Sequence, residues 1–438
     1  MTLKRMLLSV LFVTLAALST AIAQSTSVQI EAAFQKFWTA SSPEAAAQAV
    51  PDIEKSGITF EEAVARLKAG RSYPAQQTGI VRLVNKPRDG VEHYYSVNVP
   101  ENYDPTRKYQ VRFQLHGGVD GRADNQPRGN GAIGQLAGAE QIYVLPYAWR
   151  DAPWWSDDQV LNFRAIVDQL KRKYNIDENR VVIAGVSDGG TGAYYIAMRE
   201  TTLFAGFLPL NGFIMVLSNS DIDNGENFPN NLRNKPLFVV NGGRDRLYPT
   251  SVVEPFTRHL MQSGVSIDYH PQPLGEHNTT WWPQVKDLFE GFVTKHPRDP
   301  HPDTISWTAA VNSAHNRAHW LVIEEWGRRD GELAPMPDVN QSQGGALFER
   351  PKPSGRVDLV RKGNTVEAVT KGVTSFTLLI SPDRFDFSKP VKVIVNGRTA
   401  FEGRVEKSVR TLLKWAAQDN DRTMLYGAEV KVRVPNGQ

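Results

Sequence analysis

The stretch RVVIAGVSDGGTGAYYIAMRE, residues 180–200, decides the fold class. It begins as a run of apolar and β-branched residues typical of a buried strand, and it ends in a pattern typical of a helix. Ser187 lies between the two, with Gly185 and Gly189 on either side. This arrangement is typical of a serine held on a strained turn, and the alternative is a small residue in an ordinary tight loop.

The motif Gly-x-Ser-x-Gly is weak on its own, because chance supplies roughly 0.1–0.2 matches in a chain of this length. Its position between a strand and a helix gives it weight. Side chains at Gly185 and Gly189 would clash with neighbouring elements in so tight a turn. We therefore expect Ser187 at the carboxyl edge of a sheet, where open α/β sheets bind ligands.

Strand and helix signals alternate on both sides of this stretch. Two segments near residue 79 alternate in polarity like antiparallel strands, and the strands that follow are nearly continuous apolar runs separated by helices. The pattern predicts an α/β fold in which a mostly parallel sheet is covered by helices on both faces. Apolar strands are expected within 109–118, 141–148, 180–187, 204–212, 235–245 and 265–274, and helices within 156–174, 189–200, 251–262 and 281–296.

Two further parts flank this α/β domain, which we assign to residues 76–296. Residues 24–75 have the pattern of amphipathic helices, and we expect them to cap or brace the α/β domain. Residues 297–438 begin with a proline-rich linker and continue as short strands, with a hairpin signal at Asn396-Gly397. They predict a smaller, mostly-β accessory domain.

Residues 1–23 predict a signal peptide that is cleaved after Ala23. Lys4 and Arg5 form its positive region, an apolar run follows, and small residues precede the cleavage point. An N-terminal membrane anchor is the alternative, but the apolar run is short for one. The mature protein is therefore expected to be secreted or periplasmic, with no membrane attachment after cleavage.

Composition excludes several classes of protein. The formal net charge is +3 and no block of like charges occurs, which argues against a nucleic-acid partner. The chain has no cysteine, so it forms no disulfide and carries no lipidated-cysteine anchor. Its 41% of hydrophobic residues suit a globular protein with a sizeable core.

A serine hydroxyl is a poor nucleophile without a base. Among the nine histidines, His277 is the candidate base, because it lies between the last predicted strand of the sheet and the closing helix. That loop belongs to the same carboxyl edge as Ser187. A histidine on an ordinary surface loop is the alternative. His116, in the run LHGG, is expected to act as a structural hydrogen-bonding group.

An imidazole base needs a carboxylate to fix its tautomer and stabilise its charge. Asp245 directly follows an apolar strand and is the candidate. A helix cap or an ion pair with a neighbouring arginine is the alternative for this residue. Asp221 and Asp223, in a preceding loop, are fallback candidates.

The oxyanion of an acyl-transfer reaction needs backbone N–H donors. We expect one donor from Asp188, directly after Ser187, and a second from the loop that holds Gly117 and Gly118. Glycines there would let the backbone approach a substrate closely. A simple glycine turn is the alternative.

The runs LHGG, GVSDGG, NGGRDRLYP and GEHNTTWWP make residues 79–296 resemble the α/β-hydrolase superfamily, as does the chain order Ser187, Asp245, His277. Within it, the chain is similar to the secreted esterase, polyhydroxybutyrate-depolymerase-like and prolyl-oligopeptidase-like branches. The resemblance implies a serine hydrolase that works through an acyl-enzyme, and it implies no metal or organic cofactor. It covers about half of the chain, and we find no N-terminal propeller of the oligopeptidase kind.

Aromatic residues lie next to these motifs in the sequence. They predict an aromatic wall for a substrate, and the alternative is packing of helix starts against the sheet. These residues are Trp154, Trp155, Tyr248, Trp281 and Trp282.

The sequence thus predicts a secreted serine hydrolase whose substrate is a carboxylic ester, either a small molecule or a polymer-linked group. A peptidase of the same fold is an alternative, since its active-site residues would be identical. A carbohydrate- or polymer-binding protein is the alternative from another class. The oligomeric state has no signal in the sequence.

Overall fold

The computed structural model describes residues 27–87, 91–121, 133–327, 331, 347–348 and 350–435. The predicted signal peptide lies outside the described residues. The chain forms two compact units, one of Met1–Ser72 with Glu406–Ala428 and one of Tyr73–Val405 with Glu429–Gln438. Among the described residues, no helix has the length and apolar character needed to cross a membrane.

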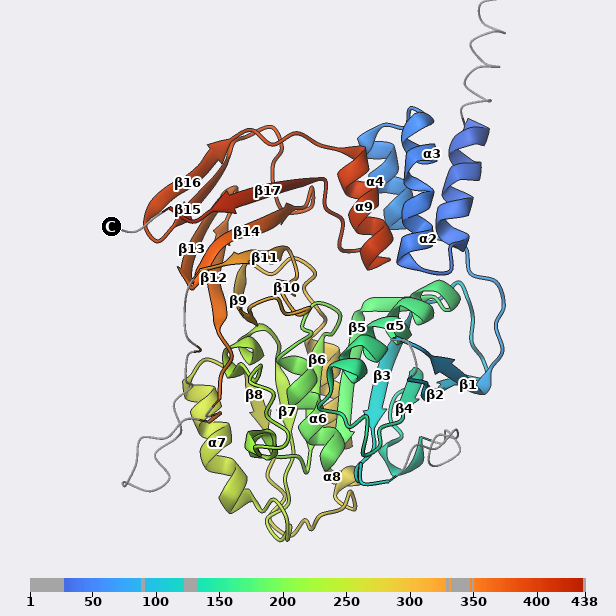
Figure 1. Ribbon diagram of the computed structural model, residues 1–438. Coiled ribbons are helices and arrows are strands. Elements are labelled where there is room, and N and C mark those ends of the chain that lie inside the picture. The colour runs from blue at the N-terminus through green and yellow to red at the C-terminus, as the bar shows by residue number, and fades with distance from the viewer. Residues whose placement is uncertain are drawn as a thin grey trace, which may run out of the picture. The chain divides into compact units, whose positions relative to one another are not determined.

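The larger unit contains an eight-stranded sheet in the order β1-β2-β4-β3-β5-β6-β7-β8 (Figure 1). The pairs β1/β2 and β2/β4 are antiparallel, and every other neighbouring pair is parallel. The mostly parallel sheet predicted from the sequence is confirmed. Its strands are β1 Gly79–Asn85, β2 His93–Val99, β3 Tyr109–Leu115, β4 Ile142–Pro146, β5 Ile176–Val186, β6 Gly206–Leu210, β7 Leu237–Val239 and β8 Ile267–Tyr269.

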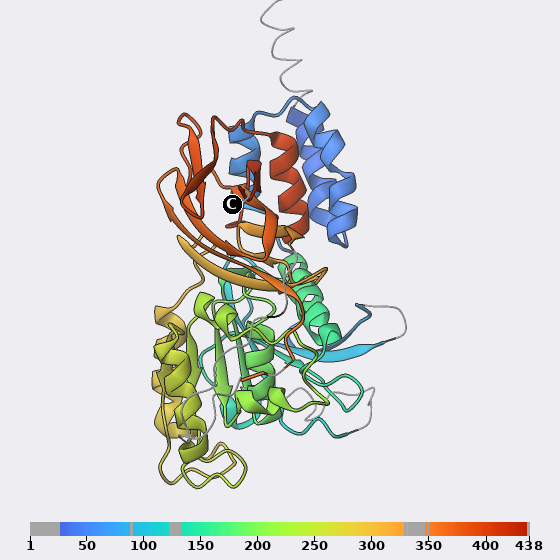
Figure 2. The ribbon, with the colours of Figure 1, turned by 60° about the vertical axis from the view of Figure 1, so that its left-hand side comes forward.

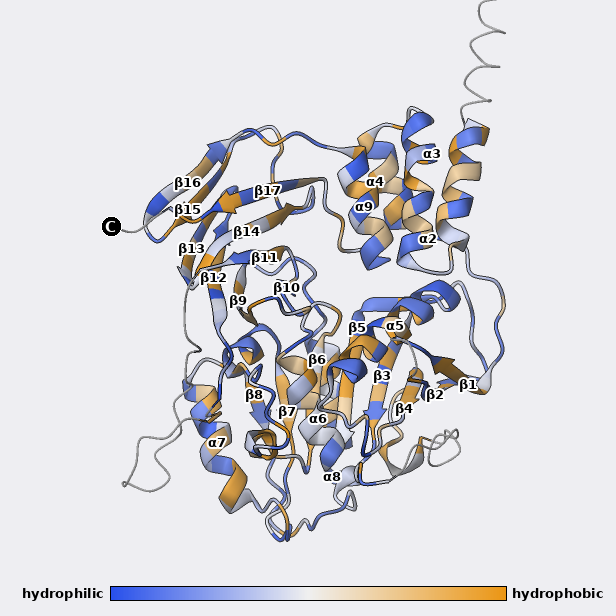
Figure 3. Cartoon of the chain, viewed as in Figure 1, coloured by the Kyte–Doolittle hydropathy of each residue, from blue (hydrophilic) through white to orange (hydrophobic). Residues whose placement is uncertain are grey.

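Helices cover both faces of this sheet, because successive side chains of a strand point to opposite faces. Val181 and Ile183 of β5 pack in one core with α5 and α6, while Val182 and Ala184 pack in another core with α8. Figure 3 shows the hydrophobic character of the central strands. The helices are α5 Asp157–Lys173, α6 Asp188–Ala197, α7 Thr250–Gln262 and α8 Trp282–Lys295, with 3-10 turns η2 Gly134–Leu136, η3 Ile214–Ser218 and η4 Pro229–Asn234.

The C-terminal part of the same unit forms two further sheets, drawn mostly in orange and red in Figure 2. Their strand orders are β10-β11-β14-β17 and β16-β15-β13-β12-β9. The Asn396-Gly397 turn joins β15 to β16, and both residues have positive φ, as the hairpin signal predicts. The strands are β9 Thr304–Ala310, β10 Arg317–Ala318, β11 Leu321–Trp326, β12 Ser354–Lys362, β13 Thr365–Lys371, β14 Val373–Ile380, β15 Val391–Val395, β16 Arg398–Gly403 and β17 Ala428–Arg433.

Side-chain amides of η4 bind the edge of strand β9. Asn231 accepts a hydrogen bond from Thr308 N (2.8 Å) and donates one to Thr308 O (2.9 Å). Asn234 does the same with Ser306 N (3.1 Å) and O (2.7 Å). Two asparagines thus satisfy backbone groups that a neighbouring strand would otherwise pair.

The segment predicted as a linker after His296 is packed into the larger unit, which corrects that prediction. Arg298 is only 3% exposed, and its guanidinium donates to the side chain of Asn179 at 3.0 and 2.8 Å. The proline content predicted a linker, and the buried Arg298 shows that this linker is fixed to the larger unit by a side chain.

The smaller unit joins the N-terminal helices to a segment near the C-terminus, Glu406–Ala428. It contains a helix over residues 27–39, then α2 Pro43–Gln48, α3 Val50–Lys55, α4 Phe60–Ala69 and, from the C-terminal part, α9 Val409–Asp419. These helices share one apolar core. The sequence assigned residues 24–75 and 297–438 to separate domains, so the grouping of α9 with the N-terminal helices differs from that prediction.

Candidate active site

Ser187 lies on a strained turn between β5 and α6. Its backbone has φ 56° and ψ −119°, a conformation that non-glycine residues rarely adopt. A Cβ added at Gly185 would lie 2.1 Å from Gly189 O, and one at Gly189 would lie 2.3 Å from Leu115 O. The turn therefore has the crowding that the sequence predicts for both glycines.

His277 bridges Ser187 and Asp245. Its Nε2 lies 2.8 Å from Ser187 Oγ, and its Nδ1 lies 2.7 Å from Asp245 Oδ2. The Asp245 side chain is fully buried, whereas the His277 side chain is 24% exposed. The structure thus brings together the three residues chosen from the sequence, in an arrangement where the imidazole can take the serine proton while the carboxylate balances its charge.

Backbone groups of its own loop hold the Asp245 carboxylate in place. Oδ1 accepts hydrogen bonds from Leu247 N (2.8 Å) and Tyr248 N (3.0 Å), which leaves Oδ2 facing His277. The fallback candidates lie elsewhere. Asp223 Oδ1 accepts from groups of its own loop, and Asp221 is exposed.

The glycine loop after β3 lies directly against Ser187. A Cβ added at Gly117 would lie 3.0 Å from Ser187 Cβ, and Gly118 has φ 68°. The Asp188 side chain ties this loop to α6, since its Oδ2 accepts a hydrogen bond from Val119 N at 3.0 Å. The predicted oxyanion residues Gly117, Gly118 and Asp188 are therefore neighbours of the serine.

His116 shapes the same loop. Its Nε2 accepts a hydrogen bond from Ala148 N (3.1 Å), so Nδ1 carries the proton and donates to Gly117 O (3.0 Å). The His116 carbonyl in turn accepts from Trp154 Nε1 at 2.9 Å. These contacts fit the structural role expected for His116.

Asn211, which the sequence analysis did not select, holds the loop of His277. It directly follows β6, is fully buried and has φ 48°. Its Nδ2 donates to the carbonyl of Asn278 at 2.8 Å, one residue after His277. The Asn-Gly pair at the end of an apolar strand is the signal that could have identified it.

Three of the five predicted aromatic residues are buried in the core, which corrects the prediction that they line a substrate site. Trp154 is 0% exposed, and Trp281 and Trp282 are each 4% exposed. Trp282 Nε1 donates to Ala137 O at 3.1 Å. Trp155 is half-buried against the main core. The alternative interpretation, packing of helix starts against the sheet, describes the three buried tryptophans.

Tyr248 lies next to the histidine. Its ring lies edge-on to the His277 ring, with centroids 5.7 Å apart, and 5.8 Å from the ring of Phe213, a residue that the sequence analysis did not select. Burial raises the pKa of Tyr248, and the negative charges of Asp188 and Asp245 raise it further. The phenol is therefore neutral beside the site.

Among the residues that the structure describes, no group of three or more His, Asp or Glu side chains is placed to hold a metal ion.

Residues 147–286 match the prolyl oligopeptidase family. The chain contains a domain with the α/β-hydrolase fold. The bifunctional acetylxylan esterase/xylanase XynS20E of Neocallimastix patriciarum is 25% identical over 197 residues, which are 41% of this chain and 26% of that protein. The chain thus matches about a quarter of that relative's length.

Solved structures are similar over half of the chain. A thermostable esterase is 22% identical over 50% of this chain and 63% of its own, with a TM-score of 0.39. A ferulic acid esterase is 18% identical, and the match covers 50% of this chain and 99% of that protein, with a TM-score of 0.40. A Bacteroides ovatus protein assigned as a dipeptidyl aminopeptidase IV is 16% identical. The match covers 50% of this chain and 36% of that protein, with a TM-score of 0.43. These likenesses are too distant to carry an argument about substrate.

Proposed function

We propose that the protein is a secreted or periplasmic serine hydrolase that cleaves carboxylic esters. The observation that carries the proposal is the position of His277, 2.8 Å from Ser187 Oγ and 2.7 Å from Asp245 Oδ2. A histidine held between a hydroxyl and a buried carboxylate is the arrangement that activates a serine nucleophile.

The reaction runs in two halves. Ser187 Oγ attacks the ester carbonyl carbon while His277 takes the hydroxyl proton, and backbone N–H groups of Asp188 and of the Gly117–Gly118 loop stabilise the oxyanion. His277 then gives the proton to the leaving alcohol, which leaves the acyl group on Ser187. Water, deprotonated by His277, then attacks the acyl carbon. His277 returns this proton to Ser187 Oγ as the serine–acyl bond breaks and the acid leaves. Asp245 orients the imidazole and stabilises its positive charge throughout.

The name of the relative in Neocallimastix patriciarum favours an ester over an amide, because that protein is an acetylxylan esterase. The match to the prolyl oligopeptidase family favours a peptidase as the second candidate. Both reactions would use the same residues, so a substrate panel separates them. Short acyl esters, feruloyl esters and peptide amides make up that panel.

Replacing Ser187 by alanine is expected to lower ester turnover by at least about 10⁴-fold, because the covalent step is lost. Ser381→Ala is the matched control. Its Oγ also lies near a histidine, 3.2 Å from His301 Nε2, but that pair is buried, so turnover should persist. Undiminished turnover by Ser187→Ala would refute the mechanism, and preferential amide cleavage would favour the peptidase.

A further inference from the structure

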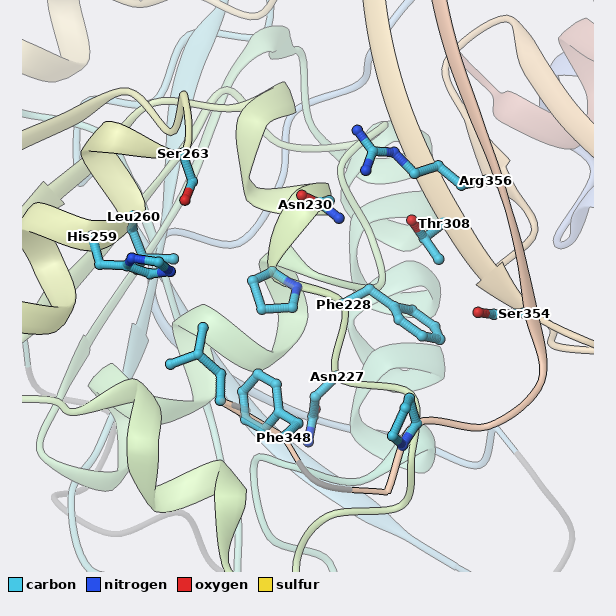
Figure 4. Close-up of a pocket in the computed structure, with 13 residues that line it drawn as sticks. Asn227, Phe228, Asn230, His259, Leu260, Ser263, Thr308, Phe348, Ser354 and Arg356 are labelled. Carbon is cyan, nitrogen blue, oxygen red and sulfur yellow. The ribbon is translucent and has the colours of Figure 1, made fainter. Parts of the chain in front are cut away.

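A cavity of about 180 Å³ lies where α7, η4 and the strands β9 and β12 meet (Figure 4). Ser187, Asp245 and His277 do not line it. The cavity and the loop of Asp245 lie at opposite ends of α7, since His259 and Leu260 line the cavity and the helix begins at Thr250. At a rise of about 1.5 Å per residue, nearly the whole helix separates the two places.

Polar side chains from three elements converge on this cavity. Asn230 of η4, Thr308 of β9 and Ser354 of β12 line it, and Figure 4 shows these side chains among those around the cavity. Thr308 is only 7% exposed, and its Oγ1 has no hydrogen-bond partner among the described residues. A buried hydroxyl without a partner is costly, so this atom is suited to a partner that enters the cavity.

The charge in the cavity wall is already balanced. Arg356 lines the cavity, and its Nη2 donates a hydrogen bond to Asp358 Oδ1 at 2.8 Å. Its Nε lies 2.8 Å from Asp358 Oδ2 as an ion-pair contact without a hydrogen bond, so the guanidinium charge already faces a carboxylate. An anionic ligand would have to compete with Asp358, whereas a neutral ligand with hydroxyl groups would not.

Apolar rings complete the wall. Phe228 is 7% exposed and Phe348 is 3% exposed, and both line the cavity. Aromatic surface beside a few fixed polar groups is the usual composition of a small-ligand site. The C–H face of a sugar ring can pack on such rings while its hydroxyl groups meet the polar side chains.

We propose that this cavity is a non-catalytic site for one neutral sugar residue. Its volume of about 180 Å³ is small beside the roughly 300–1,000 Å³ of pockets for larger ligands, which suits a single ring. The proposal does not depend on the hydrolase activity, because its residues lie outside the catalytic group.

The test is a titration of the full chain with D-xylose, D-glucose and D-glucuronate, followed by ligand-observed NMR. We expect saturable binding of a neutral sugar in the millimolar range. Thr308→Val should weaken it about fivefold or more, because the one unpartnered hydroxyl is lost. Ser375→Ala is the matched control, since Ser375 Oγ is also buried without a partner but lies in β14 and does not line the cavity.

Asn230→Ala provides a second variant, because the half-buried Asn230 side chain can be shortened with little risk to folding. It should weaken sugar binding as Thr308→Val does, while ester turnover stays unchanged in both. Any of three results would overturn the proposal: the absence of saturable binding of a neutral sugar, stronger binding of glucuronate than of the neutral sugars, or unchanged sugar binding in both variants. Because sugar binding is measured without ester turnover, these results do not depend on whether Ser187→Ala abolishes turnover.

Discussion

At the scale of single residues, the candidate site depends on side chains that lie just beyond strand ends. Ser187, Asp245 and His277 could be chosen from the sequence because each follows an apolar run that ends at the same edge of a parallel sheet. The solvent exposure of the neighbouring aromatic side chains could not be predicted in the same way. Trp154 and Trp282 are close to the motifs in the chain, yet tertiary packing buries them.

Asn211 offers a residue-scale prediction about catalysis. Asn211→Gly keeps a backbone suited to φ 48° but removes the amide that holds the Asn278 carbonyl. We expect kcat to fall about 10–100-fold with little change in KM, because a small displacement of His277 misaligns the proton transfer.

Asn396→Gly is the matched control for this experiment, since Asn396 also has a positive φ, 51°, but lies in the hairpin between β15 and β16. Its kcat should equal that of the wild type. A folded Asn211→Gly enzyme with wild-type kcat would show that Asn211 does not position His277.

At the scale of elements, caps and turns were predictable because their signals are local. Ser42, Thr59 and Ser156 cap α2, α4 and α5 through their side chains, and Gly70 ends α4. The partner of each helix was not predictable. An amphipathic pattern shows that a helix has an apolar face, but it does not say which other face covers it.

The strand-to-helix turn gives an element-scale prediction about stability. Gly185→Ala is expected to prevent folding or lower the free energy of unfolding severely, because its Cβ would lie 2.1 Å from a backbone oxygen. Gly291→Ala, in α8, should raise the free energy of unfolding by about 0.5–1 kcal/mol, since a Cβ there meets nothing within 4 Å. Urea denaturation of both variants provides the measurement, and equal stabilities would contradict the crowding argument.

At the scale of the whole molecule, the fold class and the mostly-β C-terminal part could be predicted, whereas the grouping of α9 with the N-terminal helices could not. Periodicity identifies elements in order along the chain, but contacts between residues several hundred positions apart depend on matching surfaces. The burial of two cationic side chains, one just before β7 and one after α8, was likewise not predictable from the sequence. Lys235 and Arg298 look like ordinary surface residues in the sequence, yet they are 6% and 3% exposed.

Lys235 makes the stability of the larger unit depend on pH. Burial, with a further contribution from Arg298, lowers the pKa of Lys235 from 10.5 to about 7. Between about pH 7 and pH 10.5 the unfolded chain therefore binds more protons at this residue than the folded chain, so its contribution to stability rises with pH. Below pH 7 the folded protein bears the full cost of the buried charge.

Lys235→Met should accordingly raise the melting temperature most at or below pH 7, and the gain should shrink as pH approaches 10. Calorimetry at pH 6.5 and pH 9.5 checks this prediction. Lys108→Met, which replaces an exposed lysine, is the control and should leave the melting temperature unchanged at both pH values. An increase in melting temperature that is the same at both pH values would mean that the pKa of Lys235 is not lowered in the folded protein.

The shared core of the N-terminal helices and α9 has a consequence for the time at which the protein matures during synthesis. A ribosome makes about 5–20 residues per second, so α9 leaves it tens of seconds after residues 27–72. The central sheet is complete in the chain well before that moment. The apolar faces of the first helices, with Phe34 and Leu67, therefore lack their native partner until the last part of the chain is made. Residues 27–72 therefore cannot reach their final structure before α9 has been made, and a chain that stops before residue 409 cannot bury them against α9.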